Sequence, residues 1–123
     1  MRRYWYFLMA IPLLTGAAHA EPRLLMGAVC ATQVGTESVL AHWEATQGTP
    51  DESVDAVNKA DPEAKCALRR ILAEKGQPVN TVTYGSDRFD ITPVAIFGDN
   101  VDGVIMLSKG EQGFMILVSP PTI

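Results

Sequence analysis

Two apolar runs near the C-terminal end dominate the pattern of hydrophobic and polar positions. They are Val-Ile-Met-Leu at 104–107 and Phe-Met-Ile-Leu-Val at 114–118, and a polar connection with two glycines, 109–113, separates them. Runs of this length bounded by Gly and Pro are typical of strands buried on both faces. A five-residue connection with glycines suits a hairpin. We therefore expect two paired antiparallel strands, with Met106 and Met115 in the core.

Upstream of these runs, apolar and polar residues alternate with a period of two, as in half-buried strands. The alternation predicts one strand over 79–84 and, after a turn at 85–88, a second over 89–97. Pro93 interrupts the second strand, and proline is tolerated in sheets only at an edge or a bulge. A turn-rich loop is expected at 98–103. The C-terminal half thus predicts an antiparallel sheet of about four strands.

Helical signals precede the predicted sheet. Val39, Leu40 and Trp43 are spaced to share one face of a helix over 36–46. The stretch 49–52, Thr-Pro-Asp-Glu, combines a cap residue, proline at the first helical position and glutamate three residues after the cap. This combination is a capping box, and it predicts the start of a second helix.

A third helix is predicted after Asp-Pro at 61–62, where the aspartate can cap and the proline can open the helix. Apolar residues follow at helical spacing through 64–72, and Gly76 is the expected C-terminal stop. Cys66 would lie in the first turns of this helix. Residues 24–31 are apolar and fit a strand or a helix; we favour a helix because they lead into another helical pattern.

These elements predict the α+β class, with two or three N-terminal helices packed on a C-terminal antiparallel sheet of about four strands, in one domain over 21–123. The last two strands are apolar on both faces, whereas three short helices cover only one face. Two arrangements stay open. Either the sheet curls into a partial barrel, or its exposed face meets a partner.

The first twenty residues have the order of a secretory signal peptide. Arg2 and Arg3 form a basic start, 7–14 is an apolar run, and Ala-His-Ala at 18–20 is a cleavage site. The apolar run is too short to span a membrane. We expect a mature chain that starts at Glu21, has no membrane span and works in the periplasm; a secreted destination stays open.

Acidic residues outnumber basic ones in this chain. It has 14 Asp and Glu against 10 Lys and Arg, a net charge of −4. Loss of Arg2 and Arg3 with the signal peptide leaves 8 basic residues against 14 acidic ones, a net charge of −6. A general nucleic-acid-binding protein needs a basic face, so this class is excluded. The acidic balance mildly favours a basic partner.

Cys30 and Cys66 are the only cysteines. In an exported protein an isolated pair is most often a disulfide, which here would tie the N-terminal segment to the third helix. Two free thiols and a two-ligand metal site are the alternatives. A metal site would need histidine or carboxylate ligands near both sulfurs, and the spacing gives no sign of them. We expect a disulfide, no metal and no cofactor.

No catalytic arrangement is evident in the sequence. His42 is the only histidine after residue 20, and it lies one position off the apolar face of its helix. No serine occupies a Gly-x-Ser-x-Gly elbow, and the paired acids of the predicted loops fit turn geometry better than glycosidase chemistry. A small hydrolase that uses His42 or paired acids is therefore the least favoured hypothesis.

The leading hypothesis is a non-catalytic protein-binding module of the inhibitor or immunity type, acting on another envelope protein. Acidic residues at the hairpin ends are its expected contacts, with two aromatic anchors: Asp87, Asp99, Asp102, Glu111, Trp43 and Tyr84. Packing at a helix–sheet seam is the alternative role of Trp43. The alternative function is a structural accessory subunit of an envelope or secretion assembly, docking by an apolar sheet face or an edge strand. Homo-oligomerisation stays open.

Overall fold

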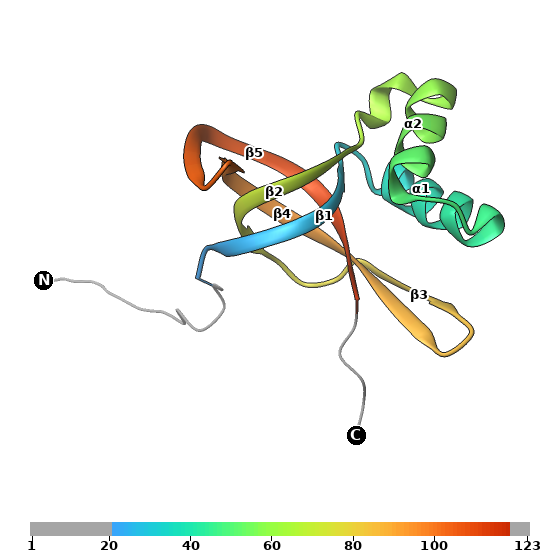
Figure 1. Ribbon diagram of the computed structural model, residues 1–123. Coiled ribbons are helices and arrows are strands. Elements are labelled where there is room, and N and C mark those ends of the chain that lie inside the picture. The colour runs from blue at the N-terminus through green and yellow to red at the C-terminus, as the bar shows by residue number, and fades with distance from the viewer. Residues whose placement is uncertain (1–20, 119–123) are drawn as a thin grey trace, which may run out of the picture.

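The computed structural model describes residues 21–118, and these form an α+β fold (Figure 1). The elements in chain order are β1 Arg23–Cys30, α1 Gln33–Thr46, α2 Pro50–Ala60, the 3₁₀ helix Pro62–Ala64, β2 Ala67–Lys75, β3 Asn80–Tyr84, β4 Asp87–Val101 and β5 Val104–Val118. The predicted class is confirmed. The antiparallel sheet has five strands, however, and the helices lie between β1 and β2 instead of ahead of the sheet. The predicted signal peptide, 1–20, lies outside the described residues.

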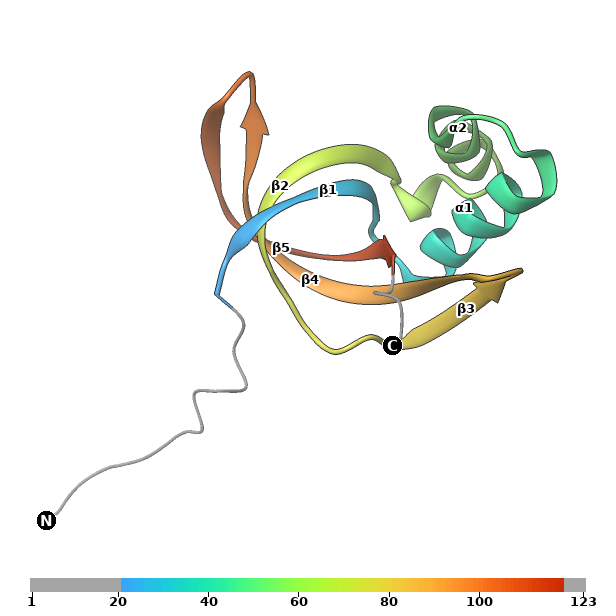
Figure 2. The same cartoon turned by 60° about the horizontal axis from the view of Figure 1, so that its bottom comes forward.

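The sheet closes on itself. Its strand order is β2-β1-β5-β4-β3, and β2 pairs with β4 as well as with β1. Strands β1, β2, β4 and β5 therefore form a ring, and β3 adds to the first part of β4 (Figures 1 and 2). Of the two arrangements expected for a sheet that is apolar on both faces, strong curvature is the one observed.

Closure separates the core into an inner and an outer part. The side chains inside the ring are contributed by all four of its strands: Val29, Ile71, Ala73, Val94, Ile96 and Met115. Helices α1 and α2 cover part of the outer face, where Val39, Val54 and Val57 pack against Ala28 and the disulfide. The same outer layer continues to Leu40, Phe89 and Ile91. The helices thus position the outer core, and the sheet alone encloses the inner one.

Residues 24–31 form β1, so the helix favoured there is wrong. The strand pairs with β2 from Arg23 to Val29. Leu25 and Val29 contact the inner core, whereas Leu24 and Met26 remain exposed. This alternation is that of a strand with one buried face. Backbone N–H and C=O groups of a buried segment need hydrogen-bond partners, and β2 supplies these partners along one edge of the strand.

The predicted third helix is also wrong. Only a single 3₁₀ turn forms at Pro62–Ala64, Lys65 then turns the chain in the left-handed conformation (φ 48°), and β2 starts at Ala67. Apolar residues spaced for a helix fit a strand equally well here, because Ile71 and Ala73 lie two apart and are both fully buried in the ring. Pairing with β1 on one side and β4 on the other outweighs local helix propensity.

The two helices begin at well-formed caps. α1 starts three residues before the predicted position, because the hydroxyl of Thr32 accepts a hydrogen bond from the Gly35 N–H at 3.0 Å. The capping box of α2 is confirmed. The Thr49 hydroxyl accepts from the Glu52 N–H, and the Thr49 N–H donates to the Glu52 carboxylate, both at 3.2 Å. The first N–H groups of a helix have no acceptor within the helix, and these caps supply an acceptor for one of them in each helix.

The sequence predicted an edge or a bulge at Pro93. The structure places Pro93 inside β4, at a gap between the β3–β4 pairing and the β2–β4 pairing. Pairing with β3 ends at Ile91, and pairing with β2 begins at Val94. The Pro93 carbonyl faces this gap and accepts a hydrogen bond from the Gly76 N–H at 2.9 Å. The N–H that proline lacks would face the same side of the strand. That missing N–H therefore falls at the end of the β2–β4 ladder, at a residue that neither β2 nor β3 pairs.

The loop expected at 98–103 is instead the end of β4 and a tight turn. Asp102 and Gly103 both have positive φ, 52° and 85°, as the central residues of a type I′ hairpin turn require. Gly98 permits a close approach of the two strands, because a Cβ there would lie 2.8 Å from the Met106 carbonyl oxygen. β4 and β5 consequently form one long hairpin.

The two predicted strands at 104–107 and 114–118 are a single strand, β5. The connection between them is absorbed as a bulge, in which residues 108–110 face the single residue Phe97. Gly110 adopts φ 80° within it, a conformation that glycine reaches without a steric penalty. The bulge bends the hairpin where it leaves the ring.

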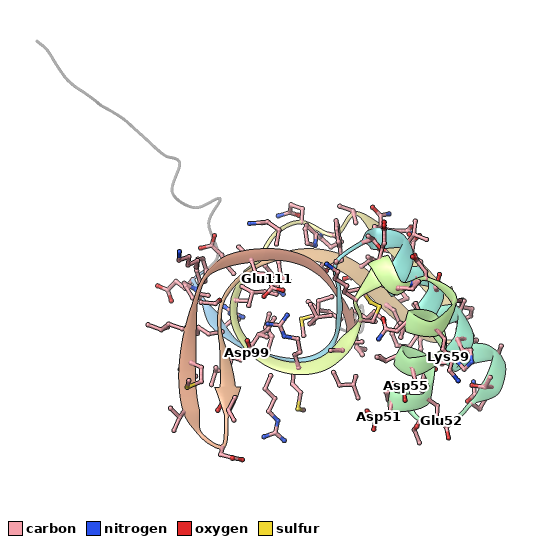
Figure 3. All side chains as sticks on the ribbon, turned by 90° about the horizontal axis from the view of Figure 1, so that it is seen from above. Asp51, Glu52, Asp55, Lys59, Asp99 and Glu111 are labelled. Carbon is pink, nitrogen blue, oxygen red and sulfur yellow. A yellow bond between two sulfur atoms is a disulfide. The ribbon has the colours of Figure 1, made fainter. Side chains whose placement is uncertain are left out.

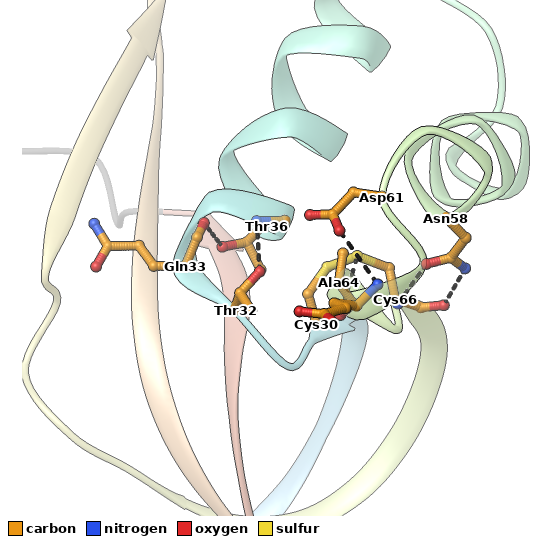
Figure 4. The surroundings of a disulfide bond; sticks show 10 residues. Cys30, Thr32, Gln33, Thr36, Asn58, Asp61, Ala64 and Cys66 are labelled. Atoms are coloured by element: carbon orange, nitrogen blue, oxygen red, sulfur yellow. Dashed lines mark hydrogen bonds between the residues drawn. A yellow bond between two sulfur atoms is a disulfide. The ribbon is translucent and has the colours of Figure 1, made fainter.

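The Cys30–Cys66 disulfide joins the end of β1 to the residue just before β2, so the predicted pairing is confirmed and its place in the fold is corrected. Asn58 of α2 brackets Cys66: its amide donates to the Cys66 carbonyl and its oxygen accepts from the Cys66 N–H, both at 2.7 Å (Figure 4). The Ala31 N–H donates to the Ala64 carbonyl at 2.7 Å. The segment that carries the helices is thus tied at both of its ends.

We expect the variant Cys30→Ala/Cys66→Ala to lose about 2–4 kcal/mol of unfolding free energy, because the disulfide restricts a long loop of the unfolded chain. Urea denaturation of the oxidised protein and the variant measures this loss. Reduced wild-type protein is the control and should match the variant. A loss below about 1 kcal/mol would show that the packed interface and Asn58 hold the segment without the covalent bond.

A second prediction concerns Thr92, whose buried hydroxyl has no hydrogen-bond partner among the described residues. Thr92→Val removes this unsatisfied group at nearly constant shape, so we expect the unfolding free energy to stay equal or rise by about 1 kcal/mol. Thr36→Val is the matched control, since the buried Thr36 hydroxyl donates to the Gln33 carbonyl at 2.6 Å and its loss should destabilise. Equal destabilisation by both variants would contradict the prediction.

Candidate functional site

The β4–β5 hairpin extends beyond the ring and carries exposed apolar side chains (Figure 2). Their exposed fractions are 53% for Val101, 59% for Val104, 59% for Met106 and 79% for Leu107. Isolated exposed apolar residues are common on proteins. By strand alternation Val101, Val104 and Met106 share one face of the ribbon and form a patch that monomers seldom leave open, whereas Leu107 points to the opposite face. This hairpin end, Val101 to Leu107, is the candidate contact surface.

A second apolar row starts at Leu107, on the other face of the hairpin, and crosses the outer face of the ring. In β4, Gly98 pairs with Leu107 of β5 on one side and with Leu72 of β2 on the other. Leu72 in turn pairs with Leu24 of β1. Directly opposed residues point to the same face of a sheet. Leu24 is 59% exposed and Leu72 is half-buried. An apolar row therefore leads from the hairpin to the first strand.

Met106 corrects a prediction from the sequence. Met115 is fully buried inside the ring, as expected, whereas Met106 is exposed. Both lie in apolar runs of β5, but the run at 114–118 faces the ring and the helices, and the run at 104–107 lies past the bulge. The position of the bulge therefore decides which run enters the core.

Asp99 and Glu111, two of the predicted contact residues, meet at Arg69 instead of at a loop surface. Arg69 donates to both Asp99 carboxylate oxygens at 3.0 and 2.9 Å and to both Glu111 oxygens at 3.1 and 3.2 Å. Figure 3 looks down the ring, and both acids lie within its outline. The cluster ties β2 to both strands of the hairpin, so its first role is structural.

The cluster shifts the ionisation of two of its members. The hydrogen bonds from Arg69 hold the pKa of Asp99 below its usual value, against a smaller opposing effect of burial. The pKa of Arg69 is raised, first by its hydrogen bond with Asp99. Arg69 is therefore a charged guanidinium that donates four hydrogen bonds to two carboxylates, with its side chain 21% exposed.

Asp87 and Asp102, the other two predicted acids, lie at opposite ends of β4. Asp87 follows the β3–β4 turn, and Asp102 is in the β4–β5 turn. Figure 1 shows these turns on opposite sides of the molecule. The four predicted acids do not form one surface.

Trp43 and Tyr84, the predicted aromatic anchors, are half-buried at the seam between α1 and the sheet. Trp43 packs edge-on against Phe89, with ring centroids 6.1 Å apart and an interplanar angle of 81°. Tyr84 joins the same cluster from the end of β3. Both residues contribute to packing.

His42 bridges the two helices. Its Nδ1 lies 2.9 Å from the Oγ of Ser53, and Ser53 is fully buried. A serine nucleophile must reach its substrate, so this Ser–His pair lacks the access that such chemistry requires. Within residues 21–118, no group of three or more His, Cys, Asp or Glu side chains is placed to hold a metal ion.

An apolar groove lies between the helices and the outer face of the ring. One part has a volume of about 180 Å³ and is lined by Trp43, Leu40, Phe89 and Ile116, among others. A second part of about 230 Å³ continues to Met26 and Arg70, and the two parts share Gly27, Pro50 and Leu68. The groove can take an apolar group about the size of an aromatic ring, since a cavity of about 150 Å³ holds benzene.

Comparison with known proteins finds no match. No protein family, no curated protein and no solved structure is similar to this chain at a significant level. Among residues 21–118, neither helix has the length and hydropathy needed to cross a membrane.

Sequence reasoning missed both apolar surfaces. The hairpin end was detectable, because Asp-Gly between apolar residues is a strong signal for a type I′ turn. The groove was not detectable, because its walls come from β1, α1, α2, β2, β4 and β5, which only the closed sheet and its packed helices bring together.

The Arg69 cluster predicts a pH dependence of stability. The pKa of Asp99 is lower in the folded protein than in the unfolded chain, so its ionised form stabilises the fold above the unfolded pKa of about 3.9. This contribution is lost as the pH falls through the folded pKa. We expect Asp99→Asn to be less stable than wild type at neutral pH and to lose less stability between neutral pH and pH about 2.

Urea denaturation at several pH values measures this difference. Asp102→Asn is the matched control, because Asp102 lies in the same hairpin and has no ion pair among the described side chains. It should keep the wild-type pH profile. Identical profiles for all three proteins would show that the Asp99–Arg69 pair contributes nothing measurable.

Proposed function

We propose that this protein is an exported, non-catalytic protein-binding module that contacts another envelope protein through the β4–β5 hairpin. The observation that carries the proposal is the exposed apolar side chains on both faces of the hairpin end, Val101 to Leu107, which extends beyond a closed scaffold. Interfaces bury such patches, and a handful of apolar anchors near the centre usually supply most of the affinity.

The scaffold suits this role. The hairpin is tied to β2 by Arg69 through one acid on each of its strands. Its base is part of a ring that a disulfide and a packed helical segment support. A rigid presenting element loses little conformational entropy on binding. An inhibitor or an accessory subunit could use the same surface, and both belong to this proposal.

The chemistry of the contact differs from that expected from the sequence. Asp99 and Glu111 are already engaged by Arg69, and Asp87 is remote from the hairpin end. The apolar side chains are therefore the proposed anchors, and Asp102 is the acid within the patch that has no ion pair among residues 21–118. Binding through apolar area persists at high salt, whereas binding through exposed charges is screened.

The test uses the hairpin variant Met106→Ser/Leu107→Ser as bait in a pull-down from envelope extract, beside the wild-type protein. Both residues are exposed, so we expect the unfolding free energy to change by less than about 0.5 kcal/mol. We expect the variant to lose a stoichiometric partner that the wild type retains at high salt, with affinity reduced at least about tenfold.

Two further baits make the result specific. Val79→Ser removes an exposed apolar residue near β3, far from the hairpin end, and should bind as the wild type does. Asp87→Asn/Asp102→Asn tests the acidic contacts. A partner that is lost with the acid variant and in salt, but kept by the hairpin variant, would refute the hairpin as the contact surface.

A further inference from the structure

We propose that the groove between the helices and the ring is a second, independent peptide-binding site. Its occupant is an apolar side chain, aromatic or leucine, that is followed by an acidic residue in an extended segment of a partner protein. This site does not depend on the hairpin, because none of the residues that line the groove belongs to the hairpin end.

The apolar half of the occupant follows from the part of the groove that Trp43 lines. Trp43, Leu40, Phe89 and Ile116 give this part an apolar lining, and its volume of about 180 Å³ matches one ring-sized group. It is open to the outer face of the sheet and is too small for a long acyl chain. A single side chain from a peptide therefore fits better than a lipid.

The acidic half follows from the free charge at one end of the groove. The second part of the groove reaches Arg70, an exposed residue with no carboxylate within ion-pair distance among residues 21–118. Its neighbour Arg69 is already occupied by two acids. Arg70 is absent from the apolar part, so an acidic group next to the apolar side chain of the ligand is attracted to the Arg70 end.

One edge of β1 is free beside the groove. Gly27 of β1 borders both parts of the groove, and the close approach that it permits is to β5, since a Cβ there would lie 3.3 Å from the Met115 Cε. The pairing of β1 with β5 covers only Val29 and Cys30, so the edge of β1 before Val29 has no ladder partner on that side among the described strands. An extended segment can use such an edge for backbone hydrogen bonds while its side chain enters the pocket.

The test is an NMR titration of the oxidised protein with the capped dipeptide acetyl-Phe-Asp-amide. We expect saturable shifts of the Trp43 indole N–H and of the Gly27 and Leu68 amides, with weak, millimolar affinity for so small a probe. Acetyl-Ala-Asp-amide should cause no such shifts. Acetyl-Phe-Asn-amide should bind about two- to fivefold more weakly, as expected for one exposed ion pair.

Three variants test whether the probe binds in this groove and in this orientation. Arg70→Gln should bind the Asp and Asn peptides equally, and Leu68→Glu should abolish binding. Both positions are exposed, and a dispersed amide spectrum verifies that each variant is folded. Leu107→Glu, on the hairpin, should bind the probe as wild type does, so failure of the hairpin proposal leaves this result unaffected.

Four outcomes would overturn the inference: no shift at Trp43 up to the solubility limit of the probe, equal shifts with the alanine peptide, tighter binding of octanoate than of the peptide, or dilution-dependent shifts at Trp43 and Leu68 without any ligand. The third outcome would indicate a fatty-acid site. The fourth would indicate that a second copy of the chain fills the groove.

Discussion

The pairing of β2 with β4 is the interaction on which the rest of the structure depends. It joins Ile71–Lys75 to Val94–Asp99 and turns an open sheet into a ring. Without it, two edges would expose unpaired backbone groups, and Ile71, Ala73 and Ile96 would lack the opposite wall of their core. Closure lets residues 21–118, which form two short α-helices, bury the inner face of the ring without a covering helix layer on that side.

Closure also determines where the remaining surfaces lie. The helices cover only part of the outer face, and the uncovered space between them and the ring is the apolar groove. The disulfide and Asn58 hold the helical segment at its junctions with β1 and β2, which keeps the wall of the groove in place. Arg69 does the same for the hairpin by linking it to β2. The two proposed binding surfaces thus stand on one rigid frame.

Local signals were sufficient wherever a feature depends on residues close in the chain. The capping box at Thr49, the strand over 79–84 and the apolar character of Met115 were all predictable. The cysteine pair was predictable from its isolation. The stripe at 64–72 was ambiguous, because its apolar spacing suits a helix in isolation and a strand in a ring. Local pattern cannot resolve that choice, since the deciding hydrogen bonds come from β1 and β4.

The sequence by itself determined the α+β class, the disulfide pair, the capping of α2 and the acidic balance, because each depends on composition or on contacts within a few residues. Only the tertiary structure decided which apolar run of β5 is buried and which is exposed, because the bulge opposite Phe97 places one run against the ring and the other beyond it. It also decided that Asp99 and Glu111 share Arg69 across three strands, and that six elements line one groove. These features depend on how strands distant in the chain align with one another, and no pattern of neighbouring residues determines that alignment.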